Sequence, residues 1–434
     1  MNSRQLVITV LALSVGLVTR LSASDIILHN FAGGASDGKF PQSSLVSDGS
    51  MFYGVTQMGG ASNLGIVFRM NFDGTGFTNL HSFTGGLADG STPYGSLVLS
   101  GSTLYGTTTG NGPGGGGQGI IFKIDTSGAG YSIVHAFSNV TSSGRVPVGP
   151  LTIAGTTIYG TTQQGGTVDD GTIFRVNIDG TSFTQLHSFN SLNHDAAFPR
   201  SGLTLLDGTL YGMTPNGGTN GAGTIFKINT NGTGYSVIHE FPSSVDGRNP
   251  GGGLTVVGTN LYGMTGVGGT SNQMGTIFRI NTNGSGFQVV YNFQGSAGGA
   301  TGVTNDGARP QGTLLLTNGV LYGTTREGGT KIQAAGSVFE ISPDGSGFSL
   351  LNSFGGGTDG VNPQGDLTLI GGMLYGMTPL GGTFNDGVIF AVPVPEPSAG
   401  ALLLSAAAAL GAWRARNRAR SSAVCPSELG REWN

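Results

Sequence analysis

Short runs of apolar residues alternate with polar, glycine-rich segments along this chain, and the pattern predicts β-strands joined by turns. The fourth copy of the pattern is the clearest, with strands expected at 202–206, 209–214, 223–228 and 235–241. The linking segments carry Asp-Gly and Asn-Thr-Asn-Gly, which accept the positive φ angles of tight turns. Four such strands with short links predict one antiparallel, up-and-down sheet.

An apolar residue followed by Tyr-Gly recurs along the chain and marks seven copies of this sheet. The marker tyrosines are Tyr53, Tyr105, Tyr159, Tyr211, Tyr262, Tyr322 and Tyr375. Successive tyrosines are 51–60 residues apart. A period of about 50 residues is that of a four-stranded propeller blade. The predicted fold class is therefore all-β, a seven-bladed β-propeller of four-stranded antiparallel blades.

The order of strands at the two ends of the array predicts how the ring closes. The fourth strand type occurs first at residues 26–31, before the first complete sheet, and the seventh sheet ends at Val392 without one. The N-terminal strand should therefore complete the last blade. This closure would remove the exposed edges that an open array would leave. We expect the propeller to occupy residues 24–392.

The N-terminus predicts export. Arg4 is followed by an apolar run at 6–18 and by small residues around Ser22 and Ala23, as in a secretory signal peptide. Residues 1–23 are therefore expected to be a signal peptide. The alternative is a buried first strand or a membrane anchor.

Three features follow the last repeat: a Pro-Glu-Pro motif, an apolar stretch at 399–413 and arginines at alternate positions. The motif is formed by Pro395, Glu396 and Pro397. As a helix, the apolar stretch would reach about 22 Å, which is short of the roughly 30 Å hydrocarbon core of a bilayer. It therefore predicts a transient membrane association, with a plain tail anchor as the alternative.

This end of the chain, residues 393–420, resembles the PEP-CTERM sorting signal of Gram-negative bacteria. The resemblance implies recognition and processing by an exosortase-type enzyme, in organisms that make extracellular polysaccharide. It places the mature protein at the cell surface or in the extracellular matrix of a Gram-negative bacterium. The final residues, 421–434, continue past the basic cluster and are expected to be a disordered tail.

The seven copies also resemble the GloVer tandem repeat of gloeobacterial and verrucomicrobial proteins. The resemblance covers residues 26–392 and rests on Tyr-Gly, Gly-Gly-Thr and Gly-Thr-Ile-Phe elements. That family is associated with surface or secreted proteins. The resemblance implies a location and no defined activity.

Composition excludes some functions and constrains the fold. Charged residues make up only 10% of the chain and the formal net charge is −4, which argues against nucleic acid as a partner. Cys425 is the single cysteine, so the folded body has no disulfide framework. The 82 glycines recur in register with the strands, and we interpret them as turn positions.

The loop before each inner strand carries a repeated carboxylate that could bind a ligand. Four residues before the loop proline, six of the seven copies have an aspartate, and the third copy has Ser143. The six are Asp37, Asp89, Asp195, Asp246, Asp306 and Asp359. They could line a channel and bind cations or sugar hydroxyls. The alternative is that each aspartate hydrogen-bonds its own loop in an Asx-turn.

Departures from the repeat are better guides to function, because a binding or catalytic site must break the symmetry. The sixth copy has a longer loop, 294–309, and its Gly-Gly loop carries Arg326 and Glu327. We include both residues as candidate ligand contacts. The alternative is a solvent-exposed loop whose sequence varies without a functional role.

No sequence motif indicates catalysis, a cofactor or a metal site. Five of the six histidines occupy one repeat position, so a ring would hold them apart and they are interpreted as strand residues that bond a neighbouring blade. Neither a phosphate-binding loop nor a nucleophile elbow nor a paired-histidine zinc motif is present. We therefore predict no catalytic residue, no cofactor and no metal.

The leading hypothesis is an exported, non-catalytic binding or scaffold module in an extracellular polysaccharide or biofilm setting. Its partners would be an extracellular glycan or a surface protein. The alternative is a carbohydrate-active enzyme, a lyase or hydrolase, on the same propeller. An enzyme would gather two or more non-repeating carboxylates at one channel mouth, whereas a binding module would show a weakly charged rim.

Overall fold

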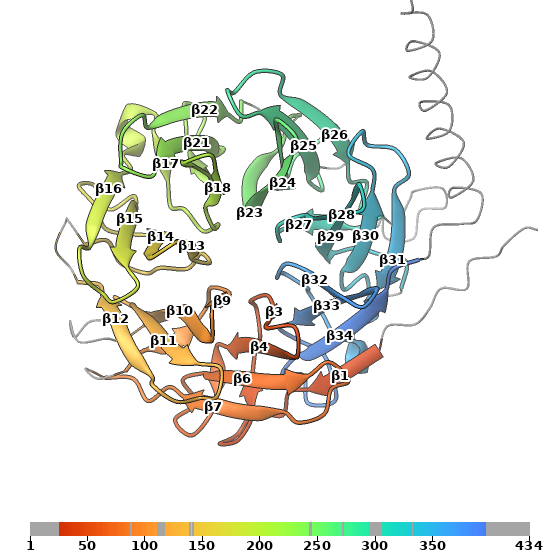
Figure 1. The fold of residues 1–434 in the computed structure, drawn as a ribbon. Coiled ribbons are helices and arrows are strands. Elements are labelled where there is room, and N and C mark those ends of the chain that lie inside the picture. Colours follow the sequence, from red (N-terminus) through yellow and green to blue (C-terminus); the bar gives the residue numbers. More distant parts are fainter. Residues whose placement is uncertain are drawn as a thin grey trace, which may run out of the picture. The chain divides into compact units, whose positions relative to one another are not determined.

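Seven antiparallel sheets surround a central axis in the computed structural model of this chain, within the part that ends at Pro393 (Figure 1). The described residues are 26–86, 89–110, 118–138, 140, 143–242, 245–270, 273–295, 306–331 and 333–395. The predicted signal peptide, the apolar stretch, the tail and two residues of the sorting motif, Glu396 and Pro397, lie outside them. Within the described part, no helix is long and apolar enough to cross a membrane.

The blades are numbered in chain order, and the strands of each are given from the innermost outward. Blade one has β3 (Val46–Ser47), β4 (Met51–Thr56), β6 (Ile66–Asn71) and β7 (Thr78–Ser82). Blade two has β9 (Val98–Ser100), β10 (Thr103–Gly110), β11 (Ile120–Asp125) and β12 (Ser132–Ala136), and β8 (Ser91–Pro93) also pairs with β10. Blade three has β13 (Thr152–Ala154), β14 (Thr157–Thr162), β15 (Thr172–Asn177) and β16 (Thr184–Ser188). Blade four has β18 (Thr204–Leu206), β19 (Thr209–Thr214), β21 (Thr224–Asn229) and β22 (Ser236–Glu240).

The remaining three blades follow the same plan. Blade five has β23 (Arg248–Val257), β24 (Asn260–Val267), β25 (Thr276–Asn281) and β26 (Gln288–Asn292). Blade six has β28 (Leu315–Thr317), β29 (Val320–Glu327), β30 (Ser337–Ile341) and β31 (Ser349–Ser353), and β27 (Ala308–Pro310) also pairs with β29. Blade seven has β32 (Thr368–Ile370), β33 (Met373–Thr378), β34 (Val388–Pro393) and β1 (Ile26–Asn30). The predicted seven-bladed, all-β propeller is confirmed.

The core lies between neighbouring blades. One apolar layer, for example, joins Tyr211 and Ile225 of blade four to Leu261 and Phe278 of blade five. Each interior sheet is therefore apolar on both faces, which explains why strict alternation of apolar and polar residues is blurred in the sequence.

Cross-strand packing explains the Tyr-Gly marker. Gly212 on β19 is paired with Phe226 on β21, and a Cβ atom at Gly212 would lie 2.4 Å from Cζ of that phenylalanine. The glycine therefore leaves room for the aromatic ring to lie across the strand. The same glycine–phenylalanine contact occurs in all seven blades.

The ring closes through the two ends of the propeller, as predicted. Strand β1 pairs antiparallel with β34, placing Ile26 opposite Ala391 and His29 opposite Ile389. The two strands lie side by side in Figure 1, red against blue. The backbone N–H of Phe31 also donates to the carbonyl of Gly387 at 3.0 Å. The fourth strand of blade seven therefore comes from the start of the chain.

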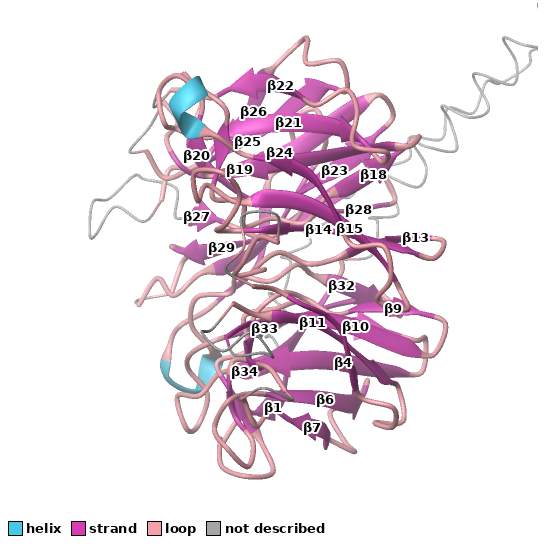
Figure 2. Cartoon of the chain, turned by 90° about the vertical axis from the view of Figure 1, so that its left-hand side faces the viewer, coloured by secondary structure: helices cyan, strands magenta, loops and turns pink. Residues whose placement is uncertain are grey.

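The Asp-containing loops and the Gly-Gly loops lie on the same face of the propeller. They pair with each other as β2 (Gly38–Lys39) with β5 (Met58–Gly59), and as β17 (Ala196–Ala197) with β20 (Asn216–Gly217). The two short 3-10 turns of the described residues belong to Asp-containing loops. They are η1 (Ser191–Asn193) and η2 (Gly357–Asp359). An edge-on view shows both turns, in cyan, on one side (Figure 2).

Candidate functional site

A cavity of about 400 Å³ opens where the segments that follow the seven loop prolines converge, at the mouth of the central channel. Its walls come from all seven repeats. The residue that directly follows each proline is of five different types among the seven copies. In chain order these residues are Gln42, Tyr94, Val148, Arg200, Gly251, Gln311 and Gln364. The channel mouth is therefore the place where the repeat symmetry is broken by polar side chains.

The residue before each loop proline adopts an unusual backbone conformation that holds the channel segment in place. All seven have φ angles between 53° and 60°, in the left-handed region. They are Phe40, Thr92, Val146, Phe198, Asn249, Arg309 and Asn362. The N–H of Val146 donates to the Gln118 carbonyl of the preceding blade at 2.9 Å, and the other six make the equivalent bond. Such a conformation costs a non-glycine residue about 1–2 kcal/mol, which the bond between blades offsets.

Side chains three residues after the proline form a hydrogen-bonded belt around part of the channel. The N–H of Gly253 donates to Thr313 Oγ1 at 2.8 Å, and the N–H of Thr313 donates to Asp366 Oδ1 at 2.6 Å. The N–H of Asp366 donates in turn to Ser44 Oγ at 2.7 Å, and that of Ser44 to Ser96 Oγ at 2.9 Å. The belt thus joins blades five, six, seven, one and two.

Blades three and four interrupt the belt. Pro150 and Gly202 stand at the same position there, and neither has a side chain that can accept a hydrogen bond. The channel wall is therefore asymmetric, with hydroxyl and carboxyl groups on one arc and bare backbone on the other.

Two charged side chains line this cavity, one from each arc. Burial raises the pKa of Asp366, against the effect of hydrogen bonds from Thr313 and Ser44. Arg200 is exposed. When the Gln163 amide is oriented with its oxygen toward Arg200, the guanidinium donates to Gln163 Oε1 at 2.9 and 3.1 Å. The rest of the lining is neutral.

The neutral lining suits a ligand rich in hydroxyl groups. Gln42, Gln311 and Gln364 each offer an amide donor and an acceptor, and each is only half-buried. Tyr94, 37% exposed, adds an aromatic ring with a polar tip. Asp366 is the single carboxyl group of the cavity, whereas most glycoside hydrolases use a pair.

Most of the carboxylates proposed from sequence hold their own loops. Asp37, Asp89, Asp195, Asp306 and Asp359 each accept at least one backbone N–H from the loop that precedes them. None of the six proposed aspartates is among the residues that line the channel cavity. Each bonds its own loop, as the alternative held, but the donor N–H lies four to twelve residues before the aspartate, so the contact is not an Asx-turn. Their role as ligand contacts stays a prediction.

Arg326 and Glu327, the other two residues proposed from sequence, end strand β29. Glu327 pairs with Arg309 at 3.3 Å. Lys331 of the same loop pairs with Asp359. Neither Arg326 nor Glu327 lines the channel cavity, and their role as ligand contacts also stays a prediction.

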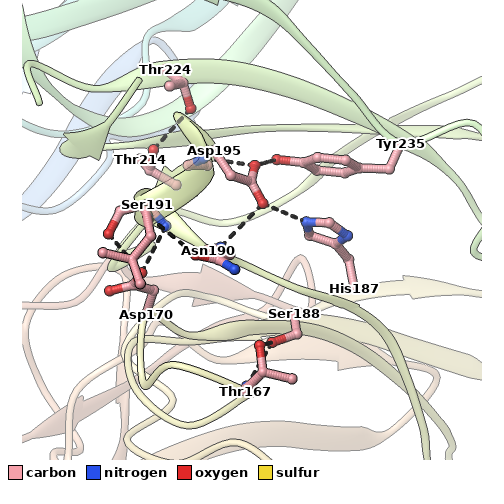
Figure 3. Close-up of polar contacts among 12 residues, drawn as sticks. Thr167, Asp170, His187, Ser188, Asn190, Ser191, Asp195, Thr214, Thr224 and Tyr235 are labelled. Atoms are coloured by element: carbon pink, nitrogen blue, oxygen red, sulfur yellow. Dashed lines mark hydrogen bonds and ion pairs between the residues drawn. The ribbon is translucent and has the colours of Figure 1, made fainter. Parts of the chain in front are cut away.

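Three of the repeated aspartates, Asp37, Asp89 and Asp195, bond a histidine that stacks on an aromatic residue of the next blade. Figure 3 shows Asp195 accepting hydrogen bonds from His187 Nε2 at 2.8 Å and from the Tyr235 hydroxyl of the next blade. The imidazole of His187 stacks on the Tyr235 ring with centroids 3.5 Å apart. His29, His81 and His187 therefore bond an aspartate of the following loop, as the sequence interpretation held, whereas Nε2 of His135 and of His239 has no hydrogen-bond partner among the described residues.

In the second and fourth repeats this bridge lowers the pKa of the aspartate. Burial opposes ionisation of Asp89, but hydrogen bonds from His81 and from the Tyr131 hydroxyl outweigh it and hold the pKa at about 2. In the sixth repeat a tyrosine replaces the histidine, and burial raises the pKa of Asp306 despite its bond from Tyr291 at 2.7 Å.

Replacing Ser143 with aspartate should restore the bridge in the third repeat. Burial lowers the pKa of His135 to about 4, and its Nε2 has no hydrogen-bond partner among the described residues. The unfolded chain thus takes up this proton at higher pH, so stability falls as the pH drops from about 6.5 to about 4. Ser143→Asp should raise this pKa by a unit or more and add about 1 kcal/mol of stability at neutral pH.

An NMR titration of the His135 ring, together with urea unfolding at several pH values, would check this prediction. His29 with Asp37 is the precedent, since it too stacks on a phenylalanine rather than a tyrosine. An unchanged His135 pKa in Ser143→Asp would contradict the expectation.

Among the described residues, no three His, Cys, Asp or Glu side chains are grouped so that they could hold a metal ion. The channel residues were not identified from the sequence. A usable signal existed, because the position directly after each repeated proline carries seven residues of five different types.

Comparison with known proteins gives a family and a fold. The family model described as Gloeobacter/Verrucomicrobia repeat matches residues 14–156, 114–305 and 300–412. No curated protein matches the sequence. Among solved structures, an oligogalacturonate lyase in complex with manganese is similar with a TM-score of 0.51 and 10% identity, covering 83% of this chain and 90% of the lyase.

Two further solved structures are similar at lower scores. A putative 6-phosphogluconolactonase from Bacteroides uniformis has a TM-score of 0.46 and 15% identity, covering 77% of this chain and 89% of its own. A chain of a nidogen/laminin complex has a TM-score of 0.44 and 14% identity, and the match covers 73% of this chain and 96% of that one. At these identities the likeness to solved structures concerns the fold alone.

Proposed function

We propose that this chain, which belongs to the Gloeobacter/Verrucomicrobia repeat family, acts as a non-catalytic binding module. Its ligand site would be the mouth of the central channel. The observation that carries the proposal is the 400 Å³ cavity lined by the non-repeating residues after the seven prolines. The other repeat positions are mostly occupied by turns and by layers between blades. A ligand site is expected where such positions converge on a concave surface.

The ligand class that fits this lining is a neutral, hydroxyl-rich chain such as a glycan. Half-buried amides bond sugar hydroxyls in both directions, and the Tyr94 ring can stack on the apolar face of a sugar. The proposal includes export to the cell surface or extracellular matrix and processing by an exosortase-type enzyme. Its support is the signal-peptide pattern at 1–23 and the Pro-Glu-Pro motif with its apolar and basic sequels.

Glycan-array binding followed by calorimetry on the hits tests the proposal. Tyr94→Ala and Gln311→Ala should each weaken binding about tenfold or more, as expected for loss of one well-placed contact. Gln288→Ala is the matched control, because this exposed glutamine lies on the outer strand β26 and should leave binding unchanged. Equal loss in all three variants, or binding that none of them alters, would place the ligand elsewhere.

One observation favours the enzyme alternative. Asp366 lies in the channel with a raised pKa, as a general acid would require. Depolymerisation of a polysaccharide by the purified protein, lost in Asp366→Asn, would replace the binding module with a lyase or hydrolase.

A further inference from the structure

Three donors converge on one carboxylate in the first, second and fourth repeats. In the fourth, Asp195 accepts from His187 Nε2 at 2.8 Å, from the N–H of Asn190 at 3.2 Å and from the N–H of Ala196 at 2.7 Å. The donors are thus a histidine, the backbone three residues after it, and the backbone that follows the aspartate.

The other two repeats show the same three donors. Asp37 accepts from His29 Nε2, from the N–H of Ala32 at 2.9 Å and from the N–H of Gly38 at 2.7 Å. Asp89 accepts from His81 and from the N–H groups of Thr84 and Gly90. The arrangement is therefore a carboxylate site built by the fold and filled by the chain itself.

The third repeat keeps the donors without the carboxylate. Ser143 stands at the aspartate position, and among the described residues its Oγ accepts only from the N–H of Ser138, at 3.0 Å. The buried Nε2 of His135 has no hydrogen-bond partner, and within the described residues none is found for the N–H of Gly144. Two of the three donors are therefore unsatisfied, which is costly for buried groups.

The imidazole of His135 is nevertheless held in the same place as in the filled sites. It stacks on Phe183 with centroids 3.8 Å apart and rings 1° from parallel. It meets the edge of Phe137 at 4.9 Å. His187 makes the same two contacts with Tyr235 and Phe189. The third repeat is thus preorganised for a carboxylate.

A surface pocket lies beside this site, although His135, Ser143 and Gly144 are not among the residues that line it. Its volume is about 240 Å³, and its walls include Ser138, Arg145, Thr167 and Asp169. Ser138 belongs both to this pocket and to the bond with Ser143. Arg145 and Asp169, which form an ion pair at 2.5 Å, both line this pocket.

We propose that the third repeat binds the carboxylate of a small anion from solution, at the position that the chain's own aspartate occupies in the first, second and fourth repeats. The anion would accept from His135 Nε2 and from the N–H of Gly144, and would lie next to the Ser143 hydroxyl. This site is separate from the channel mouth and does not depend on the proposed function.

The fifth repeat provides an internal contrast. His239 Nε2 also has no hydrogen-bond partner among the described residues, yet Asp246 stands at the aspartate position of that repeat. The negative charge of Asp246 opposes the effect of burial on the pKa of His239, so this repeat already has a carboxylate of its own near the histidine, although no hydrogen bond joins the two. The sixth and seventh repeats have Tyr291 and Asn352 in place of the histidine.

Formate is the probe, because it is the smallest carboxylate. Sodium formate would be titrated into the full chain at about pH 5.5 and at constant ionic strength. Burial keeps His135 mostly neutral at this pH, so a bound carboxylate would be detected as proton uptake by its ring. We expect a saturable shift of the His135 ring resonances, no matching shift at His239, and a rise in Tm of about 1–3 °C. The variant Ser143→Asp, which fills the site from within, should abolish both effects.

Three results would overturn the proposal. They are the absence of a saturable shift at His135, an equal response in Ser143→Asp, and an equal response to chloride, which would make the site one for any monovalent anion. His135→Phe is a second variant in case Ser143→Asp folds poorly. It keeps the stack on Phe183 and removes the donor, so a formate-dependent rise in Tm that survives in it would also overturn the proposal.

Discussion

Phe31→Ala should lower the free energy of unfolding by about 3–5 kcal/mol, the usual cost of removing a fully buried phenylalanine. The side chain is 0% exposed and meets the ring of Phe68 at 5.6 Å. Its ring directly follows the N-terminal strand β1 and packs in the apolar cluster that blade seven shares with blade one. Alanine keeps the backbone N–H that donates to the carbonyl of Gly387, but loss of the buried ring should free β1 from β34 before any other pair of strands separates. Urea unfolding and amide hydrogen exchange would measure the two effects.

Phe83→Ala is the matched control for the closure strand. Phe83 is also fully buried and meets Phe122 at 5.2 Å, but it follows a strand that the chain connects on both sides. Its loss should cost a similar free energy without faster exchange in β34. If Phe31→Ala left exchange in β34 at the wild-type rate, the role of β1 in closing the ring would be wrong.

Gly212→Ala should destabilise the protein by about 3 kcal/mol, at the upper end for overpacking a core. The new Cβ would lie 2.4 Å from Phe226 Cζ and 3.0 Å from Leu203 Cδ2, and both of these side chains are buried. The ring can move only by disturbing the layer shared with the neighbouring blade. Thermal and urea unfolding would measure the loss.

Gly258→Ala separates lack of space from backbone strain. Gly258 has a φ of 63° but nothing within 4 Å of a Cβ, so alanine there should cost about 1–2 kcal/mol. The variant Phe226→Leu removes the obstructing Cζ, and in a double-mutant cycle with Gly212→Ala it should recover about 1 kcal/mol or more. Equal costs at Gly212 and Gly258 would show that crowding by Phe226 is not the reason for the Tyr-Gly marker.

The sequence predicted the strands and the closure well because both depend on local, repeated chemistry. The fourth copy was expected at 202–206, 209–214, 223–228 and 235–241. The strands are β18, β19, β21 and β22, of which β19 has the predicted bounds and the others differ by at most two residues at either end. Closure was predicted because the fourth strand type occurs once before the first complete sheet and is missing from the last sheet. Neither inference required knowledge of contacts between blades.

Contacts between blades were out of reach of the sequence. His187 and Asp195 are eight residues apart, a spacing visible in several copies, but the role of Tyr235 depends on which strand the ring sets beside them. Asp366 lies three residues after its proline like six other residues of various types. Only convergence at the axis brings it to Thr313 and Ser44. The repeated positions of the sequence therefore predict the scaffold, whereas the residues of the candidate site are identified only when the seven copies are arranged around one axis.

The register of β1 on β34 sets how the propeller would respond to mechanical force. Ile26 begins β1 and lies opposite Ala391, near the end of β34. The first and the last residues of the propeller therefore lie at the same end of this strand pair. Tension applied between these two ends would peel the pair apart one hydrogen bond at a time, which is the weakest loading direction for antiparallel strands. Tension between the channel mouth and the C-terminal end would instead be carried by several strands of the ring at once.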